Sequence, residues 1–313
     1  MRADASSLLD FLHQSPSPYH CVHTAAEELR GAGFVELDER GVPVVFAAGS
    51  MGFVRRAGTL IAWRVGQRPI AESGFLLLGA HTDSPNLRLK PRPDLANEGY
   101  RRWGVEVYGG ALLATWLDRD LGISGRVIVR GVNGEPESRL LCIDRPLARI
   151  PNLAIHLNRG VNDDGLKVNA QRHLPPVLGL LADGDESDCR AFLSSQLGGA
   201  EVLSWDLGFH DVQAPSLGGL SDEFVFSARL DNQASCFSAL TALLAAPAAD
   251  GTQVVVLFDH EEVGSRSHHG AMGSFLKDIL CRLERDTEER GPGGLERAIA
   301  RSFLVSLDMA HGV

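Results

Sequence analysis

One short segment, VVVLFDHEEVGSRSHHG at residues 254–270, limits what this chain can fold into more than any other. Its first five residues are β-branched or large and apolar, without the polar alternation of a strand that has one face in water. The run predicts a strand buried on both faces, in a mixed, largely parallel sheet flanked by helices. Four ionisable residues follow it directly: Asp259, His260, Glu261 and Glu262. Because α/β sheets bind ligands at the carboxyl ends of their strands, we interpret these residues as part of a site.

The alternative interpretation is that these charges belong to a solvated loop, which is the usual role of a single acidic residue after a strand. Two adjacent glutamates after a histidine fit that role less well. A helical zinc motif of the His-Glu-x-x-His type is excluded, because Gly264 stands where its second histidine would be. If this segment binds a metal ion, the other ligands must come from elsewhere in the chain.

The charge of the chain argues against two classes of partner. The chain has 30 basic and 40 acidic residues, a formal net charge of −10, and no run of Lys or Arg. Such a surface repels nucleic acids and anionic membranes, so we expect neither as a partner. No apolar stretch approaches the roughly 20 residues that span a bilayer, and the first residues lack an apolar signal segment. The five cysteines are widely spaced and fit reduced thiols, so we expect a cytoplasmic protein.

The pattern of the sequence changes twice along the chain. Residues 1–90 combine helical periodicity with short apolar strands. Residues 91–226 are short strand-like runs separated by Gly, Pro and Asn, which predicts an inserted β-rich domain. Residues 227–313 return to the first pattern. We therefore expect an α/β domain made of the first and third segments, with the β-rich domain inserted between them.

Two local expectations follow from capping and hydrophobic patterns. Ser6 and Ser7 predict the cap of a short helix that Pro16 then interrupts. The run FLVSLDMAH, residues 303–311, predicts another buried strand that ends in an acidic residue.

The same pattern occurs at four predicted strand ends: each is followed by acidic residues or histidine. The residues are His81 and Asp83 after FLLLGA, Asp231 after FSARL, Glu261 and Glu262 after VVVLFDH, and Asp308 after FLVSL. If the strands belong to one parallel sheet, these side chains converge on one edge. Imidazole and carboxylates without a thiolate suit a pair of divalent ions, zinc first, with manganese or cobalt as alternatives. Clustered carboxylates also need cations, because they otherwise repel one another.

Each residue of this set also has an ordinary structural interpretation. His81 can be a hydrogen-bonded core histidine, and Asp231 can be the N-cap of the helix that follows it. Asp83 can be a turn residue before Ser84 and Pro85. The repeated pattern at four strand ends favours the metal site over these separate explanations.

Many segments of the chain resemble those of the aspartyl aminopeptidases, a family of cytosolic dizinc exopeptidases. They are SPSPYHCVHTAAEELRGAGFVEL, GAHTDSPNLRLKP, YGGALLATWLDRDLGISGRV, RIPNLAIHLNR, SARLDNQASCFSAL, LFDHEEVGS and SLDMAHGV. The resemblance covers essentially the whole chain. It implies a peptidase domain of the zinc exopeptidase type, at residues 1–90 and 227–313. It also implies that residues 91–226 serve oligomerisation and substrate binding, in a homo-oligomer that we expect to be a dodecamer.

The resemblance implies a role for each residue of the predicted site. His81 and Asp308 would hold one zinc ion, Glu262 would hold the other, and Asp231 would bridge the two. Glu261 would be the general base. Asp83 would accept a hydrogen bond from the nitrogen of His81 that does not bind metal, which fixes the tautomer of the ring. His156, in NLAIHLNR, resembles the histidine that reaches the substrate in a neighbouring subunit's active site.

These roles describe a hydrolase that removes N-terminal Asp or Glu from peptides. Two metal ions share a water and lower its pKa, and Glu261 takes its proton and delivers it to the leaving amine. The family's chains continue beyond the DMAH motif and carry their last zinc ligand, a histidine, in that continuation. We therefore expect a chain that ends at Val313 to lack this ligand and much of the pocket for an acidic side chain. His311 belongs to the motif and does not replace the missing ligand.

Two other functions remain open at this level. One is a related dizinc aminopeptidase with glutamyl, leucyl or broad specificity, because metal motifs are shared more widely than pockets. The other is a non-catalytic oligomer with structural metal ions. Because a purely structural site has no use for a base, the pair Glu261 and Glu262 argues against the second.

Overall fold

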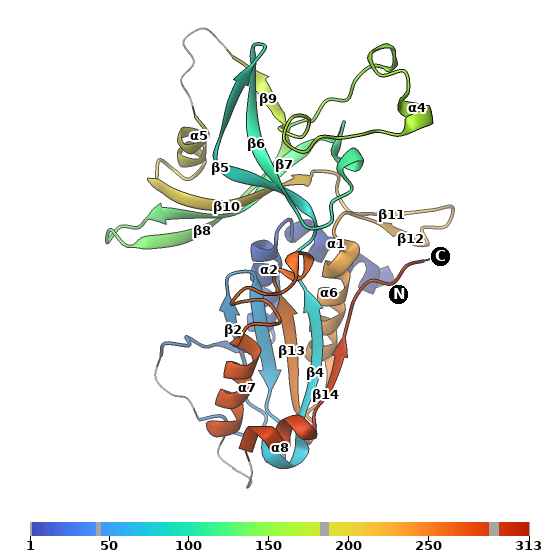
Figure 1. Cartoon of the computed structure of the whole chain (residues 1–313). Coiled ribbons are helices and arrows are strands. Elements are labelled where there is room, and N and C mark those ends of the chain that lie inside the picture. Colours follow the sequence, from blue (N-terminus) through green and yellow to red (C-terminus); the bar gives the residue numbers. More distant parts are fainter. Residues whose placement is uncertain (1, 42–44, 182–187, 288–293, 313) are drawn as a thin grey trace. The chain divides into compact units, whose positions relative to one another are not determined.

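The computed structural model describes residues 2–41, 45–181, 188–287 and 294–312 (Figure 1). The chain forms two compact units, Met1–Ser84 with Pro215–Val313 and Pro85–Ala214. The second unit begins and ends earlier than the insertion expected at residues 91–226. The reason is that the strand starting at Asn86 already belongs to the sheet of the second unit, while the hairpin at residues 216–226 belongs to the first.

The first unit is built on a mixed sheet. Its strands within the described residues are β1 (Val35–Glu36), β2 (Met51–Arg56), β3 (Thr59–Arg64), β4 (Phe75–His81), β13 (Thr252–Phe258) and β14 (Phe303–Ser306). Their order is β1-β2-β3-β13-β4-β14. The pairs β1–β2, β13–β4 and β4–β14 are parallel, whereas β3 runs antiparallel to both β2 and β13. The carboxyl ends of β13, β4 and β14 therefore lie along one edge.

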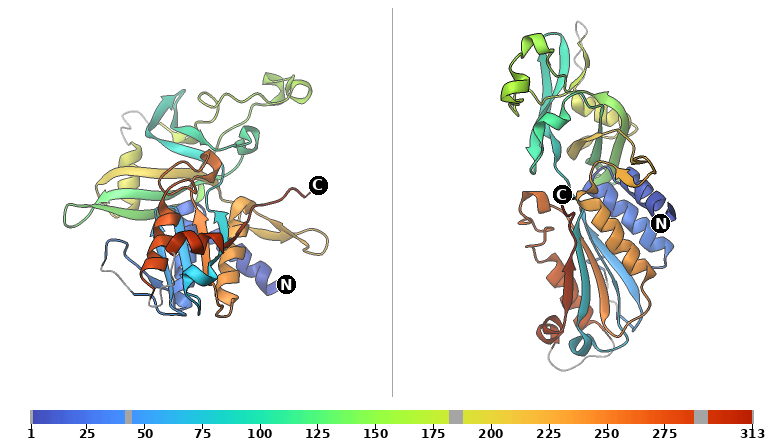
Figure 2. Two further views of the ribbon diagram at one scale, coloured as in Figure 1. Left: turned by 60° about the horizontal axis from the view of Figure 1, so that its bottom comes forward. Right: turned by 90° about the vertical axis from the view of Figure 1, so that its right-hand side faces the viewer.

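Helices cover both faces of this sheet (Figure 2). One face packs against α1 (Arg2–Gln14), α2 (Pro18–Gly31) and α6 (Leu230–Ala245), and the other against α3 (Ile70–Ser73), α7 (Phe275–Arg285) and α8 (Gly294–Ala300). Val255 and Leu257 belong to the first core, and Val254 and Val256 to the second. This confirms the strand predicted to be buried on both faces. Each of these side chains stabilises the fold by about 1.5–3 kcal/mol on burial.

The local expectations were wrong at two places. Helix α1 already includes Ser6 and Ser7, so neither of them is its cap. Strand β14 is exposed along its length, because within the described residues it pairs only with β4 and forms an edge of the sheet. The start of α2 does follow the capping rules. Ser17 accepts a hydrogen bond from the backbone N–H of His20, and Pro18 occupies the first helical turn.

The second unit is a twisted antiparallel sheet with the order β8-β7-β10-β5-β6-β9 among the described residues. Its elements are β5 (Asn86–Asn97), β6 (Tyr100–Tyr108), η1 (Leu113–Trp116), β7 (Leu121–Arg130), β8 (Pro136–Ala148), η2 (Ile155–Leu157), α4 (Val161–Asp164), β9 (Val177–Leu180), α5 (Cys189–Gln196) and β10 (Val202–Asp211). It has a hydrophobic core of its own around Trp103 and Phe209. The first unit also contains the hairpin β11 (Ser216–Gly218) and β12 (Phe224–Phe226), and the one-turn helix η3 (Glu261–Val263).

Two further observations concern the whole of the described chain. None of its helices combines the length and the apolar character needed to cross a lipid bilayer. None of the five cysteines, all of which lie in the described ranges, forms a disulfide bond.

Candidate metal centre

The turn after β13 carries Glu261 and Glu262. His260 has a left-handed backbone conformation with φ of 67°, and Gly264 has another with φ of 92°. Between them the chain makes the single turn of η3. His tolerates the left-handed region better than most residues with a side chain, and Gly adopts it freely. The sequence His-Glu-Glu-Val-Gly is therefore suited to a reversal directly after the strand.

Strand β4 brings His81 and Asp83 beside this turn, since His81 pairs in parallel register with Phe258 at the end of β13. His81 is 5% exposed and Asp83 is fully buried. The Nδ1 atom of His81 lies 3.0 Å from the backbone carbonyl oxygen of Asp83 and 3.4 Å from its carboxylate Oδ1. The same carboxylate accepts the backbone N–H groups of Glu261, at 3.1 Å, and Glu262, at 3.2 Å. Asp83 thus fixes the imidazole ring and the turn of the two glutamates together.

Asp231 reaches the site from a helix and not from a strand end, which corrects the prediction for FSARL. Residues 227–229 form no strand, and Asp231 lies in the first turn of α6. Helix α6 packs against β4 and β13, so its first turn lies at the carboxyl edge of the sheet. The Ser84 hydroxyl donates a hydrogen bond to the Asp231 carbonyl oxygen at 2.6 Å. The Asn232 amide donates one to the Leu307 carbonyl oxygen at 2.9 Å.

Asp308 follows β14 on the other side of β4. The backbone N–H of Leu307 donates to the carbonyl oxygen of Gly79 at 2.7 Å, which extends the pairing of β14 with β4 to the residue before Asp308. The Asp308 side chain is 63% exposed, and its Oδ1 accepts the N–H of Met309 at 2.8 Å. Asp308 therefore lies at the open side of the site.

The Nε2 atom of His81 is the centre of the arrangement. It lies 3.3 Å from Asp231 Oδ1, 3.7 Å from Asp308 Oδ1 and 3.8 Å from Glu261 Oε2. His81, Asp231 and Glu262 can each offer one ligand atom such that all three atoms lie within 4.8 Å of one another. The structure thus brings together six of the seven residues that the sequence analysis named for the site.

The donor set fits zinc. A zinc ion with bonds of about 2.1 Å in a tetrahedral arrangement holds its ligand atoms about 3.4 Å apart. The distance from His81 Nε2 to Asp231 Oδ1 is 3.3 Å, and the donors are imidazole nitrogen and carboxylate oxygen. The second nitrogen of His81 already faces Asp83, as metal-binding imidazoles commonly require.

In the metal-free cluster, burial and the neighbouring charges shift the pKa values of the site residues. Burial raises the pKa of Glu262, and the charges of Asp231 and Asp83 raise it further, to about 7. Partial burial also raises the pKa of Asp231, with Asp308 adding to the effect. Burial alone would lower the pKa of His81, but the hydrogen bond and charge of Asp83 outweigh it and raise that pKa to about 9. Protons take the place of positive charge here, as expected where carboxylates converge.

The remaining predicted residue, His156, lies in η2 of the second unit and is exposed. Sequence reasoning assigned no function to Ser84, although its hydroxyl holds the backbone of Asp231. It also missed Thr82, whose hydroxyl donates to the Gly58 carbonyl oxygen at 2.7 Å and so ties the end of β4 to the turn before β3. The position of both residues in HTDSP, between two predicted site residues and a proline, was the available signal.

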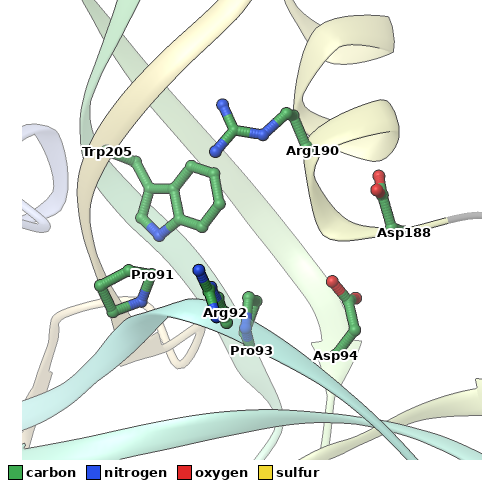
Figure 3. Close-up of a pocket in the computed structure, with 7 residues that line it drawn as sticks. All are labelled: Pro91, Arg92, Pro93, Asp94, Asp188, Arg190 and Trp205. Atoms are coloured by element: carbon green, nitrogen blue, oxygen red, sulfur yellow. The ribbon is translucent and has the colours of Figure 1, made fainter.

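A separate pocket of about 220 Å³ lies within the second unit (Figure 3). The Arg190 guanidinium lies 5.0 Å from the centre of the Trp205 ring and donates to backbone carbonyl oxygens of β10. Asp94 Oδ1 accepts the N–H of Cys189 at 2.9 Å, and Asp188 caps α5. These charged groups serve local structure, so the metal centre of the first unit remains the stronger candidate site.

Comparison with known proteins agrees with this geometry. Residues 11–313 match the family model described as "Aminopeptidase I zinc metalloprotease (M18)". A curated relative, "Probable M18 family aminopeptidase 2" of Pseudomonas aeruginosa (strain UCBPP-PA14), is 48% identical over 320 residues, which cover 100% of this chain and 73% of the relative.

Solved structures agree as well. A chain in the cryo-EM structure of the Ape4 and Nbr1 complex superposes with a TM-score of 0.90 at 35% identity, over 99% of this chain and 64% of that one. A chain of the S. cerevisiae mApe1 dodecamer has a TM-score of 0.82 at 30% identity, over 99% of this chain and 73% of that one. The chain thus spans about two thirds to three quarters of the length of these relatives.

Proposed function

Because the chain belongs to the aminopeptidase I (M18) family of zinc metalloproteases, which are hydrolases of the exopeptidase class, we propose that it removes N-terminal Asp or Glu residues from peptides. The observation that carries the proposal is the convergence of His81, Asp231 and Glu262, with Glu261 beside them. The preference for acidic residues is supported by the resemblance of its motifs to the aspartyl aminopeptidases.

Two zinc ions per subunit are part of the proposal. His81 and Asp308 would hold one ion, Glu262 would hold the other, and Asp231 would be a ligand of both. The first ion is supported by the positions of Asp231 and Asp308, whose Oδ1 atoms lie 3.3 and 3.7 Å from His81 Nε2. The assignment of Glu262 to the second ion is supported by the resemblance of the motifs. Zinc bound in this way supplies a Lewis acid that polarises the scissile carbonyl and makes water a better nucleophile near neutral pH.

Glu261 is the general base in this proposal. Its Oε2 lies 3.8 Å from His81 Nε2, and its side chain is half exposed, so it can reach both the metal centre and an incoming peptide. A carboxylate oxygen of Glu261 accepts the proton of the attacking water and then delivers it to the leaving amine nitrogen. Asp83 contributes indirectly, because it holds the ring of His81 and the backbone N–H groups of Glu261 and Glu262.

We extend the proposal to assembly and location. A homo-oligomer is supported by the dodecameric form of the related S. cerevisiae protein. Within it, His156 contacts the substrate of a neighbouring subunit, which is supported by its exposure and by its motif. A cytoplasmic location is supported by the five cysteines, none of which forms a disulfide bond, since oxidising compartments favour disulfides.

The test is hydrolysis of aspartyl, glutamyl and leucyl p-nitroanilides by the purified full-length protein, together with zinc analysis. We expect zinc to copurify, a chelator to abolish hydrolysis, and the two acidic substrates to be cleaved faster than the leucyl one by about tenfold or more, the scale on which a charged pocket discriminates. A faster leucyl reaction would instead support a related aminopeptidase of other specificity. Bound zinc without any hydrolysis would support the non-catalytic oligomer.

A further inference from the structure

The two residues before the glutamate pair, Asp259 and His260, have no place in the mechanism so far, yet they are held by a dense set of contacts. Asp259 is fully buried, and its backbone N–H donates to the Thr59 hydroxyl at 2.9 Å. Its Oδ1 accepts the N–H of His260 at 2.9 Å, and its Oδ2 lies 3.6 Å from Nε2 of the same histidine. The first edge of the His260 ring therefore faces a fixed, buried carboxylate.

The second edge of the ring faces a serine further along the loop. The Nδ1 atom of His260 lies 2.6 Å from the Ser267 hydroxyl, which also accepts the N–H of Gly270 at 3.1 Å. The backbone carbonyl of His260 accepts the N–H of Ser265 at 2.8 Å. The loop from residue 260 to residue 270 is thus folded around one imidazole ring.

The site lies directly beyond this ring. His260 directly precedes η3 as its N-cap residue, so its left-handed backbone sets the direction in which Glu261 and Glu262 leave the strand. Asp83 accepts the N–H groups of both glutamates. The turn is therefore held at two points, by Asp83 and by the contacts of His260.

We propose that His260 is a positioning residue, whose ring, held between Asp259 and Ser267, aims the carboxylates of Glu261 and Glu262 at the metal centre. Its effect on turnover rests on the proposed aminopeptidase function. The position requires a residue that tolerates a left-handed backbone and carries hydrogen-bonding nitrogen atoms on two edges of a ring. Few side chains meet both requirements. Asn and Gly accept a left-handed backbone, but neither has nitrogen atoms on opposite edges of a rigid ring. A displacement of about 1 Å at a reacting group can cost on the order of 10² in rate.

The test compares variants of this ring and of its partner. His260→Asn keeps a residue that tolerates the left-handed conformation and removes the ring. Ser267→Ala is the milder change, and Ser267→Thr restores the hydroxyl. His23→Ala is the matched control, because it removes an exposed imidazole from α2. His268 is unsuitable, since its ring lies 3.6 Å from that of His269, which lies 5.5 Å from the His260 ring. Each protein is purified with its zinc, and its melting temperature confirms that it is folded.

Two measurements are made on each variant. The first is amide hydrogen exchange at Glu261 and Glu262, which needs no activity. We expect His260→Asn and Ser267→Ala to speed it by about tenfold, because the turn then opens locally. The second is hydrolysis of aspartyl p-nitroanilide. We expect kcat to fall on the order of 10–100-fold with KM changed by less than about twofold, since positioning acts on the reacting group. Ser267→Thr and His23→Ala should behave like the parent protein.

A double variant separates positioning from general loosening of the fold. If His260 acts through Glu261, then adding Ser267→Ala to Glu261→Gln should lower the remaining rate by less than about twofold, because residues that act as a unit are not additive. Unchanged exchange in both single variants, unchanged kcat, or a full additional loss in a double variant that retains its zinc would overturn the inference. A zinc-loaded parent protein without activity would refute the proposed function instead, and hydrogen exchange would still decide the role of His260.

Discussion

Zinc binding to this site should release protons near neutral pH, and the number can be worked out from the structure. In the metal-free protein the pKa of His81 is raised to about 9, so its ring is almost fully protonated at pH 7. The pKa of Glu262 is raised to about 7, so about half of its carboxyl groups carry a proton. Zinc needs a neutral imidazole and an ionised carboxylate. Binding at pH 7 should therefore displace about 1.5 protons, nearly one from His81 and about half from Glu262.

The same two pKa values set how steeply, and in which direction, the zinc affinity and the stability of the metal-free fold change with pH. Between pH 6 and pH 8 the zinc affinity should rise by about 10³, of which about 10² comes from His81. Both pKa values are raised above those of the unfolded chain. Their contribution to the stability of the metal-free fold is therefore complete at low pH and lost as pH rises, through about 4.5 to 7 for Glu262 and 6.5 to 9 for His81. The stabilisation that zinc provides should grow over the same range.

Isothermal titration calorimetry in buffers of different ionisation enthalpy counts the released protons directly. The Glu262→Gln variant is the control, because it should release about one proton at pH 7 and bind zinc more weakly. Release of less than about half a proton by the parent protein, or an affinity that does not change between pH 6 and pH 8, would refute the reasoning, because His81 would then not exchange a proton for zinc.

Two further predictions concern assembly and packing. His156→Phe should lower turnover without lowering zinc content, and mixing it with Glu261→Gln should restore part of the rate through hybrid sites. No restoration, with subunit exchange shown independently, would mean that His156 acts within its own subunit or only structurally. Gly58→Ala should lower the free energy of unfolding by about 1–3 kcal/mol, because its methyl group would lie 2.2 Å from the buried Asp259 Oδ2. Urea denaturation measures this, and Gly31→Ala, which meets nothing within 4 Å, should show no such loss.

The sheet could be predicted largely from the sequence, because its central strands carry a strong local signal. An uninterrupted run of β-branched and large apolar residues such as residues 254–258 favours a strand covered on both faces, and Val254 and Val255 do belong to opposite cores. The exposure of β14 could not be predicted in the same way. Its residues are as apolar as those of β13, and only the tertiary pairing decides which strand lies at an edge of the sheet.

The sequence predicts which residues form the site better than it predicts which elements bring them together. His81, Glu261 and Asp308 follow strands of one sheet, so their convergence follows from topology. Asp231 reaches the site in another way. The strand before it, β12, ends at Phe226 and pairs with β11 and not with the main sheet, and residues 227–229 then lead into α6. The network of Asp259, His260 and Ser267 depends on a left-handed turn and on contacts seven residues apart, which no periodicity reveals. Hydrogen bonds that depend on one backbone conformation can be recognised only in a three-dimensional structure.

The central claim is that the two adjacent glutamates divide the work, with Glu262 holding metal and Glu261 moving protons. The most direct test measures zinc content and aspartyl p-nitroanilide hydrolysis for Glu261→Gln and Glu262→Gln side by side. We expect Glu261→Gln to keep its zinc and to lose turnover by on the order of 10²–10⁴, the usual contribution of a positioned acid and base. Glu262→Gln should lose zinc together with activity. If Glu261→Gln lost its zinc as well, then Glu261 would be a metal ligand and this division of roles would be wrong.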